Sequence, residues 1–201
     1  MSKLDLGNNE FINYEFHENI GKNTIVFSNS LGSDLSMWDP QAEYFKDDYQ
    51  IIRYDKRGHG KSSPIQGPYT FDMLENDVIS IMDEIGIDKV HFVGLSMGGM
   101  TSLGLALKHS NRFDKLVCCA ARADMPPSAI EAWDQRMAVV EDKGTQGVVQ
   151  GSLERWFSDK FRNDVANNHI LEKAEEMIKS TSTNGYIGSC NCLLYTSPSP
   201  R

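Results

Sequence analysis

The chain has 201 residues, of which 40% are hydrophobic and 24% charged, a balance typical of one main globular domain with a sizeable core. Its 28 acidic against 20 basic side chains give a formal net charge of -8, without a long Lys/Arg cluster. This charge argues against nucleic acid or a membrane as a partner and favours a small molecule. The N-terminus lacks a secretory signal, and no apolar run reaches the roughly 18 residues of a membrane span, so we expect a cytoplasmic protein.

The first predicted elements are strands separated by loops. Apolar and polar residues alternate over residues 12–17, which predicts a half-buried antiparallel strand, and residues 24–28 and 51–55 predict two more strands. Between the last two, Asp39 and Pro40 form an N-cap followed by a first-turn proline and predict a short helix. A glycine-rich loop, residues 56–62, follows the strand at 51–55.

The next elements continue a strand-then-helix rhythm. Apolar residues in a helical period fill residues 71–85, where Thr70 can cap the start and Gly86 can end the helix. The apolar run 90–93 predicts a strand, and KLVCCAA at 115–121 predicts another, apolar on both faces and therefore covered by helices on both sides. The rhythm predicts a mainly parallel, doubly wound sheet with an antiparallel start.

The four cysteines predict neither disulfides nor a metal site. Cys118 and Cys119 lie within an apolar run and are expected to be buried free thiols. Cys190 and Cys192 lack the second pair of ligands that a zinc site needs.

The motif GLSMGG, residues 94–99, predicts a nucleophile elbow centred on Ser96. In such a turn a strained serine presents its hydroxyl at the end of a parallel sheet, ahead of a helix N-terminus. Gly94 and Gly98 stand where a Cβ would collide across the turn. The alternative is a glycine-rich turn without chemistry, and the strand before the motif and the helix after it favour the elbow.

Beyond residue 125 the pattern changes to helices only, near residues 128–141, 148–157 and 165–180. A helical insertion at this point of the sheet is expected to cover a substrate, although an unrelated small helical domain is the alternative. The division we predict is a core at 1–125, a cap at 126–187 and a truncated end at 188–201. The last ten residues, CLLYTSPSPR, resemble a translated sequencing adapter, and a Ser/Pro-rich disordered tail is the alternative.

The chain resembles the α/β-hydrolase superfamily, most closely the 3-oxoadipate enol-lactonases. The elbow and the RGHG turn at 57–60 are features of the whole superfamily. The first loop has Asn29-Ser30 where a His-Gly pair is usual, and the lactonases show the same replacement. The segments that carry the resemblance are FSNSLGSDLSMWDPQ at 27–41, RYDKRGHGKSS at 53–63, GPYTFDML at 67–74, HFVGLSMGGM at 91–100 and RWF at 155–157.

This resemblance implies an α/β-hydrolase fold with about six of its eight strands present, and an enzyme of the β-ketoadipate pathway of aromatic degradation. It implies that Ser96 attacks the lactone carbonyl while the backbone N–H groups of Leu31 and Met97 form the oxyanion hole. The family's catalytic Asp and His are expected beyond the end of this chain, which would make it an inactive fragment. The reaction implies no cofactor.

Other residues of the chain are alternatives for these roles. Asp55 and Arg57 are expected to fix the RGHG loop. Asp124 could serve as the acid of a rearranged triad, but it lacks a histidine to orient. The histidines that could replace the absent base, each more consistent with a structural or solvated role, are His59, His91, His109 and His169.

The cap offers cations for a substrate carboxylate. Arg136 and Arg155 could hold it, beside apolar walls that include Trp133 and Trp156. Two alternatives to the lactonase stay open. One is another α/β-hydrolase, such as a carboxylesterase, thioesterase, perhydrolase or C–C hydrolase, and the other is a non-catalytic ligand-binding member of the fold.

Overall fold

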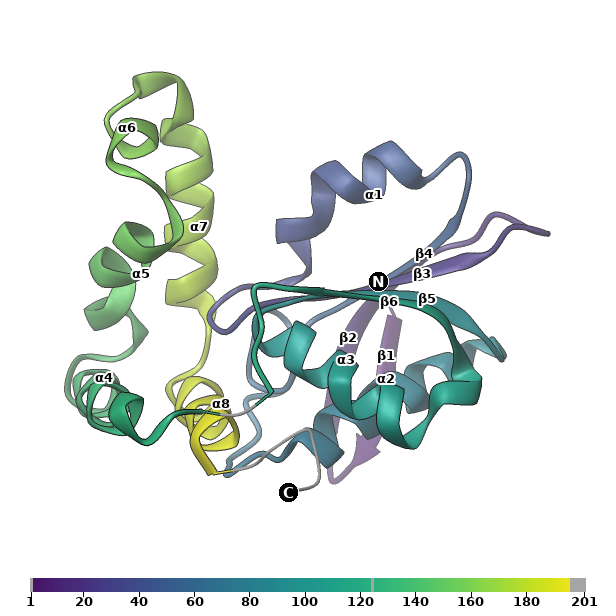
Figure 1. Ribbon diagram of the computed structural model, residues 1–201, viewed down its shortest axis with the longest axis horizontal. Coiled ribbons are helices and arrows are strands. Elements are labelled where there is room, and N and C mark those ends of the chain that lie inside the picture. Colours follow the sequence, from purple (N-terminus) through teal and green to yellow (C-terminus); the bar gives the residue numbers. More distant parts are fainter. Residues whose placement is uncertain (1, 124, 196–201) are drawn as a thin grey trace.

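The structure, a computed structural model, describes residues 2–123 and 125–195, and within them one sheet has the strand order β1-β2-β4-β3-β5-β6 (Figure 1). β3 pairs in parallel with β4 and β5, and β5 in parallel with β6, whereas β2 is antiparallel to both β1 and β4. The predicted parallel sheet with an antiparallel start is therefore confirmed. The strands are β1 (Ser2–Gly7), β2 (Glu10–His17), β3 (Thr24–Ser28), β4 (Gln50–Tyr54), β5 (Val90–Leu95) and β6 (Phe113–Cys119).

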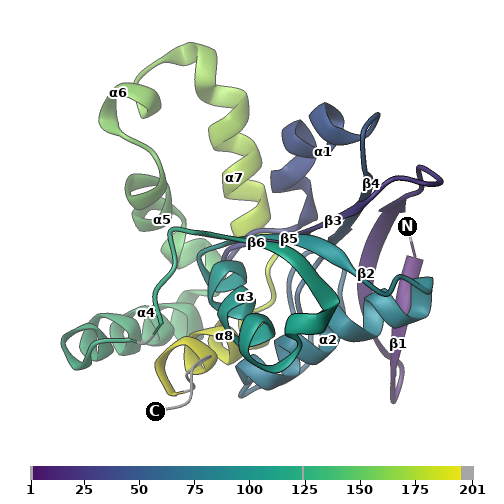
Figure 2. The ribbon, with the colours of Figure 1, turned by 45° about the vertical axis from the view of Figure 1, so that its right-hand side comes forward.

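Three helices cover the two faces of the sheet. α1 (Asp39–Phe45) lies on one face, and α2 (Phe71–Ile85) and α3 (Met97–Lys108) lie on the other (Figures 1 and 2). Neighbouring strand residues point to opposite faces, so Ile51 packs with α1 while Ile52 packs with α2. This two-sided burial explains the continuous apolar runs of the central strands.

The helix boundaries agree with their sequence signals, with one shift. The Thr70 hydroxyl accepts a hydrogen bond from the N–H of Met73 at the start of α2, and Gly86 ends that helix at a φ of 76°. Asp39 is the first residue of α1 rather than its N-cap, because the helix follows directly on a 3₁₀ turn (Leu35–Trp38) that Asp34 caps. The predicted cap thus lies one turn earlier than expected.

The N-terminal strand β1 was absent from the predicted elements. It forms a hairpin with β2 through a two-residue turn, in which Asn8 and Asn9 have φ values of 54° and 63°. Asparagine tolerates this left-handed region, which a tight hairpin turn requires at both positions. The signal for this hairpin in the sequence is the Asn8-Asn9 pair between two short stretches of alternating apolar and polar residues.

The expectation that residues 115–121 are covered on both sides is wrong. Within the described residues β6 pairs only with β5, and Val117, 48% exposed, and Cys118 lie open to solvent. The prediction of a buried thiol is therefore wrong for Cys118, and Cys119 is only half-buried. Cys190 and Cys192 are buried. An apolar run by itself does not show whether other elements cover both faces of a strand.

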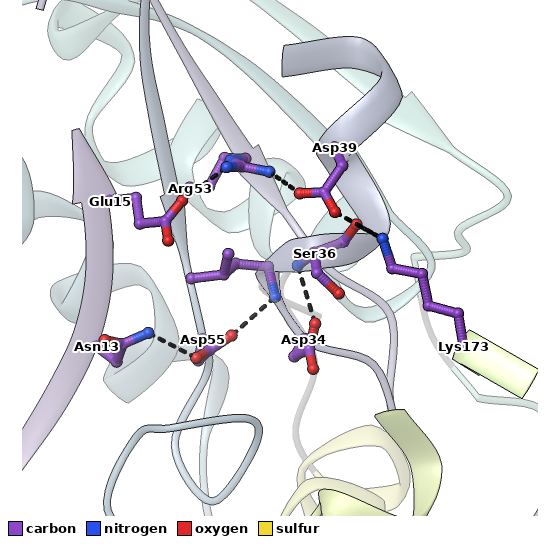
Figure 3. Close-up of polar contacts among 9 residues, drawn as sticks. Asn13, Glu15, Asp34, Ser36, Asp39, Arg53, Asp55 and Lys173 are labelled. Carbon is purple, nitrogen blue, oxygen red and sulfur yellow. Dashed lines mark hydrogen bonds and ion pairs between the residues drawn. The ribbon is translucent and has the colours of Figure 1, made fainter. Parts of the chain in front are cut away.

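A helical arm stands beside the sheet (Figure 1). One of its helices, α7, is tied to the core by Lys173, whose Nζ donates to the carbonyl of Ser36 at 2.8 Å and to Asp39 at 2.6 Å (Figure 3). Asp39 also accepts from Arg53, which pairs with Glu15 on β2. The helices of the arm are α4 (Ile130–Lys143), α5 (Val149–Trp156), α6 (Asp159–Arg162) and α7 (Asn168–Ser180).

The last described helix, α8 (Thr183–Tyr195), crosses the predicted boundary between residues 187 and 188. Its glycines pack against loops of the core, since a Cβ on Gly188 would lie 2.9 Å from the ring of Tyr69. Cys192 and Leu193, assigned above to a tail, are buried in the same cluster as Val140 of α4. Residues 196–201 and Asp124, the alternative acid, lie outside the described residues. Among the described helices, none has the length and apolar character needed to cross a bilayer.

Candidate active site

Ser96 lies in a strained turn between β5 and α3. Its φ of 54° and ψ of -110° fall in a sparsely populated region, which costs about 1 to 3 kcal/mol for a residue with a side chain. The Ser96 N–H donates to the carbonyl of Cys119 at 2.8 Å, and the Ser96 carbonyl accepts from the N–H of Met100 at 2.9 Å. These bonds hold the half-buried serine in its unusual conformation.

The glycines beside the serine are sterically required, as predicted. A Cβ on Gly94 would lie 2.2 Å from the carbonyl oxygen of Gly98, and a Cβ on Gly98 would lie 2.4 Å from that of Ser28. The N–H of Gly98 also donates to the carbonyl of Asn29 at 3.1 Å. The turn at Ser96 is thus packed directly against the end of β3 and the loop that follows it.

The two amides predicted for the oxyanion hole are available as donors. Met97 is the first residue of α3, and Leu31 lies in the loop after β3. Within residues 2–123 and 125–195, neither N–H donates to a protein acceptor. An N–H in the first turn of a helix has no partner in its own helix, so that of Met97 is free to bind a ligand oxygen.

The loop of Leu31, residues 29–33, is braced by the RGHG segment. The Nε2 atom of His59 accepts a hydrogen bond from the N–H of Gly32 at 3.1 Å, and the Nζ atom of Lys56 donates to the carbonyl of Asn29 at 2.5 Å. Burial and the nearby charge of Lys56 lower the pKa of His59 to about 3. The ring is therefore neutral at pH 7 and acts here as an acceptor.

Asp55 and Arg57 fix this segment, as expected. The carboxylate of Asp55 accepts hydrogen bonds from the N–H of Leu35 at 2.7 Å and the Nδ2 of Asn13 at 2.8 Å (Figure 3). Burial raises its pKa, an effect that these hydrogen bonds oppose. Arg57 holds Asp77 of α2 through two bonds of 2.7 and 2.6 Å. The side chains of Asp55 and Arg57 therefore stabilise the loop and its contact with α2.

The histidines weighed as replacement bases do not serve Ser96 in this arrangement. Both ring nitrogens of His59 are occupied, since Nδ1 lies 2.9 Å from the carbonyl of Arg57. His91 is near the start of β5, roughly 16 Å from Ser96 at about 3.3 Å per residue. His109 follows the far end of α3, roughly 18 Å away. His169 is exposed in the first turn of α7.

The four cap residues predicted to bind substrate form two pairs. The Arg136 guanidinium lies 4.4 Å from the ring centroid of Trp133 on α4, and Arg155 precedes Trp156 at the end of α5. Burial lowers the pKa of Arg155, and the positive charge of Arg136 lowers it further. Trp156 reaches the core, since its Cη2 lies 3.9 Å from the position of a Cβ on Gly32.

Tyr186 of α8 joins this group, and sequence reasoning missed it. The residue is 2% exposed, and its Cε2 lies 3.4 Å from the position of a Cβ on Gly32. Burial raises the pKa of Tyr186, while the charges of Arg136 and Arg155 oppose the shift. The phenol ring therefore packs beside the loop of Leu31, and both arginines are near enough for their charges to act on it. No motif marked it, because the segment around it shows neither a helical period nor a family signature.

A hollow of the described surface lies elsewhere. It has a volume of about 540 Å³ and is lined by residues of β2, α1 and β4, including Glu15, Asp39 and Arg53. It contains none of the predicted site residues. The polar groups that line it are paired with one another, so it carries no chemistry of its own.

The sheet order, the turn at Ser96 and the helical arm define an α/β-hydrolase, and comparison with known proteins agrees. The alpha/beta hydrolase fold family matches residues 23–196. The chain belongs to this family.

Among the curated relatives, the chain is similar to two 3-oxoadipate enol-lactonases of Acinetobacter baylyi. It is 36% identical to enol-lactonase 2 over 94% of this chain and 70% of the relative, and 38% identical to enol-lactonase 1 over 84% and 62%. The crystal structure of the enol-lactonase from Burkholderia xenovorans LB400 superposes with a TM-score of 0.86 at 33% identity, covering 94% of this chain and 72% of that one. A putative carbamate hydrolase RutD of Caulobacter segnis is 32% identical over 86% of this chain and 65% of its own length.

Proposed function

We propose that this chain carries the nucleophile, the oxyanion donors and the substrate-binding cap of a serine hydrolase that opens 3-oxoadipate enol-lactone. The observation that carries the proposal is the strained turn at Ser96, beside the unpartnered N–H groups of Met97 and Leu31. Strain of this size persists where it positions a reacting atom. The similarity to two enol-lactonases supports the choice of substrate.

In the proposed reaction the Oγ of Ser96 attacks the lactone carbonyl and gives its proton to a histidine base. The tetrahedral oxyanion accepts hydrogen bonds from the amides of Leu31 and Met97. The ring C–O bond then breaks, and the enol oxygen takes the proton from the base before the enol tautomerises to a ketone. Water attacks the acyl-serine, releases 3-oxoadipate and restores Ser96. The scheme needs no cofactor.

The cap supplies recognition of a carboxylate in this proposal. Arg136 and Arg155 can each donate two parallel hydrogen bonds to a carboxylate, and Trp133 and Trp156 provide apolar walls. Tyr186 packs beside the loop of Leu31 and is near both arginines. In this proposal the substrate extends past Tyr186, with its carbonyl at Leu31 and its carboxylate at the arginines. The substrate of such a site is a small anionic lactone, of the kind consumed in the cytoplasmic β-ketoadipate pathway.

The 201-residue chain alone is expected to turn over the lactone at a negligible rate. Both ring nitrogens of His59 have hydrogen-bond partners, and His91 and His109 lie at the ends of β5 and α3 that are remote from Ser96. Loss of a triad member removes on the order of a million-fold in turnover in a serine protease. The test therefore assays the 201-residue chain beside any longer product of its gene.

The experiment follows the loss of enol-lactone absorbance with the wild-type protein, Ser96→Ala and the control Ser102→Ala. Ser102 lies on α3, where its hydroxyl bonds only to the carbonyl of Gly99. Ser96→Ala should abolish hydrolysis, whereas Ser102→Ala should keep it within about threefold. A fluorophosphonate probe should label the peptide that contains Ser96. Hydrolysis that survives in Ser96→Ala would contradict the proposal.

A substrate panel separates the lactonase from the other hydrolases. Enol-lactone, a neutral aryl ester, an acyl thioester and a carbamate are compared by kcat/KM in the same preparation. The two cap arginines favour the anionic lactone, and we expect it to be turned over fastest. A neutral ester preferred by tenfold or more would assign the site to an esterase, and Ser96 labelled without turnover of any substrate would indicate a ligand-binding protein.

A further inference from the structure

Lys56 is a buried lysine that the proposed mechanism leaves without a role. It is 1% exposed, and within residues 2–123 and 125–195 its amine forms no ion pair with a carboxylate. Its Nζ donates instead to two backbone carbonyls, that of Asn29 at 2.5 Å and that of Ser30 at 3.2 Å. Burial of an ammonium group is expensive, so its retention in this position calls for a function.

The two carbonyls belong to the loop that presents Leu31. The carbonyl of Ser30 and the N–H of Leu31 are parts of one trans peptide group, so they point in opposite directions. A cation bound to the Ser30 oxygen therefore fixes the direction of the Leu31 N–H. It also draws electron density away from that N–H and strengthens it as a donor, as in other polarised hydrogen-bond chains.

The second carbonyl connects the same lysine to the turn at Ser96. The carbonyl of Asn29 accepts both from Lys56 and from the N–H of Gly98 at 3.1 Å. One ammonium group thus contacts the loop of Leu31 and, through Asn29, the first turn of the helix that carries Met97. Both proposed oxyanion donors are positioned against a shared support.

The titratable groups around Lys56 leave its charge available to these carbonyls. Asp55, the adjacent residue, directs its carboxylate to Leu35, Asn13 and Lys61. His59 is neutral and bonds to Gly32 and Arg57. Burial lowers the pKa of Lys56 to about 7, against the opposing charge of Asp55. The charge of Asp55 favours the ammonium form, whose hydrogen-bond acceptors are the two loop carbonyls, and a pKa of about 7 means that the proton is lost near neutral pH.

We propose that Lys56 is a positioning residue for the oxyanion hole, and that its ammonium group orients and polarises the Ser30–Leu31 peptide. This inference rests on the proposed hydrolase function. It assigns to Lys56 the stabilisation of charge that develops in the transition state, without contact with the substrate. Loss of the charge should lower kcat and leave KM nearly unchanged, because the ground-state carbonyl gains little from a stronger donor.

The first test needs no catalysis and uses the 201-residue chain. The amide ¹⁵N and ¹H resonances of Leu31 are followed by NMR from pH 5.5 to pH 9 in the wild-type chain, in Lys56→Met and in the control Lys61→Met. The Leu31 resonance should titrate near pH 7 in the wild type and in Lys61→Met, and should not titrate in Lys56→Met. A Leu31 resonance that is constant with pH in the wild type overturns the proposal, even if Lys56→Met does not fold.

The second test uses the active gene product and its pH profile. Lys56→Met should lower kcat for the enol-lactone about tenfold, with KM within about twofold and with a thermal midpoint no lower than that of the wild type. The wild type should lose activity as pH rises above about 7.5, because Lys56 becomes neutral, and Lys56→Met should lack this alkaline decline. A variant with wild-type kcat and an unchanged pH profile overturns the role of Lys56.

The two proposals fail in different ways. Failure of the hydrolase proposal appears as lactone hydrolysis that survives in Ser96→Ala, whatever Lys56→Met does. Failure of the present inference appears as a kcat unchanged by Lys56→Met in a protein that Ser96→Ala inactivates. A merely structural role for Lys56 would lower the thermal midpoint without moving the alkaline limb, and that result also contradicts the inference.

Discussion

The N–H of Gly98 donates to the carbonyl of Asn29 at 3.1 Å, and this bond joins the turn at Ser96 to the loop that carries Leu31. The two segments lie far apart in the sequence, at the ends of the neighbouring parallel strands β3 and β5. The close contact is possible because Gly98 has no Cβ and approaches the backbone of Ser28. The strain at Ser96 is therefore supported from outside its own turn.

Relief of this strain should make the protein more stable and inactive. We expect Ser96→Gly to raise the free energy of unfolding by about 1 kcal/mol, because glycine adopts a φ of 54° without steric cost. Ser96→Ala keeps the steric cost and should leave stability within about 0.5 kcal/mol of the wild type. Urea denaturation of the 201-residue chain measures both. A destabilised Ser96→Gly variant would show that the serine conformation is unstrained.

The packing at Gly98 predicts a large loss of stability on a small substitution. Gly98→Ala places a Cβ 2.4 Å from a backbone oxygen and should destabilise the fold by about 3 kcal/mol. The matched control is Gly151→Ala on α5, where the nearest atom is the flexible end of Arg155 at 3.3 Å. That change should stabilise the chain by about 0.5 to 1 kcal/mol. Equal effects of the two substitutions in thermal denaturation would contradict the described packing.

The neutral His59 predicts a specific dependence of stability on pH. Its pKa is about 3 in the folded state against about 6.5 in the unfolded chain, so the unfolded state binds the extra proton between these values. The contribution of the neutral His59 to the free energy of unfolding is complete above about pH 6.5. It is lost as pH falls toward 3, by up to about 1.4 kcal/mol per pH unit.

His59→Gln isolates this contribution, because a glutamine oxygen can still accept from the N–H of Gly32. The difference in free energy of unfolding between wild type and variant should shrink steadily from pH 6.5 to pH 5. His169→Gln, at an exposed position, is the control and should follow the wild type. If the free energy of unfolding of His59→Gln falls with decreasing pH as steeply as that of the wild type, another group binds the proton.

The cap arginines predict a defect in substrate binding. Arg136→Ala and Arg155→Ala in the active gene product should each raise KM for the enol-lactone by about tenfold, because a charge-assisted hydrogen bond to a carboxylate contributes about 1.5 to 3 kcal/mol. Arg162→Ala, on the exposed helix α6, removes a cap arginine that pairs with Asp159 and should leave KM unchanged. An unchanged KM in either of the first two variants removes that arginine from the site.

Local signals in the sequence were sufficient for the regular elements of the core. Thr70 and Gly86 bound α2 because capping chemistry depends on a few neighbouring residues. The hairpin at Asn8 and the exposure of Val117 were missed. The hairpin gave only a weak, short alternation, and the exposure of a strand face depends on which elements pack on it, a property that no single strand encodes.

In the candidate site, too, some features follow from local sequence and others only from tertiary contacts. The steric requirement for glycine around Ser96 follows from a motif of six residues, whereas the roles of the Leu31 and Met97 amides were implied by the family resemblance. The contacts of Tyr186 and Lys56 with the loop of Leu31 had no such signal. These contacts join residues that are distant in the chain and become neighbours only when α8 and the RGHG segment pack on the sheet.

The sequence by itself determined the strand-and-helix rhythm, the elbow at Ser96 and the membership in a hydrolase family, because each depends on short-range patterns. Only the tertiary structure decided which groups support the elbow: a neutral His59, a buried Lys56 and the phenol of Tyr186. The physical reason is that burial and long-range contacts set the charge state and orientation of these groups, and both arise when the chain folds.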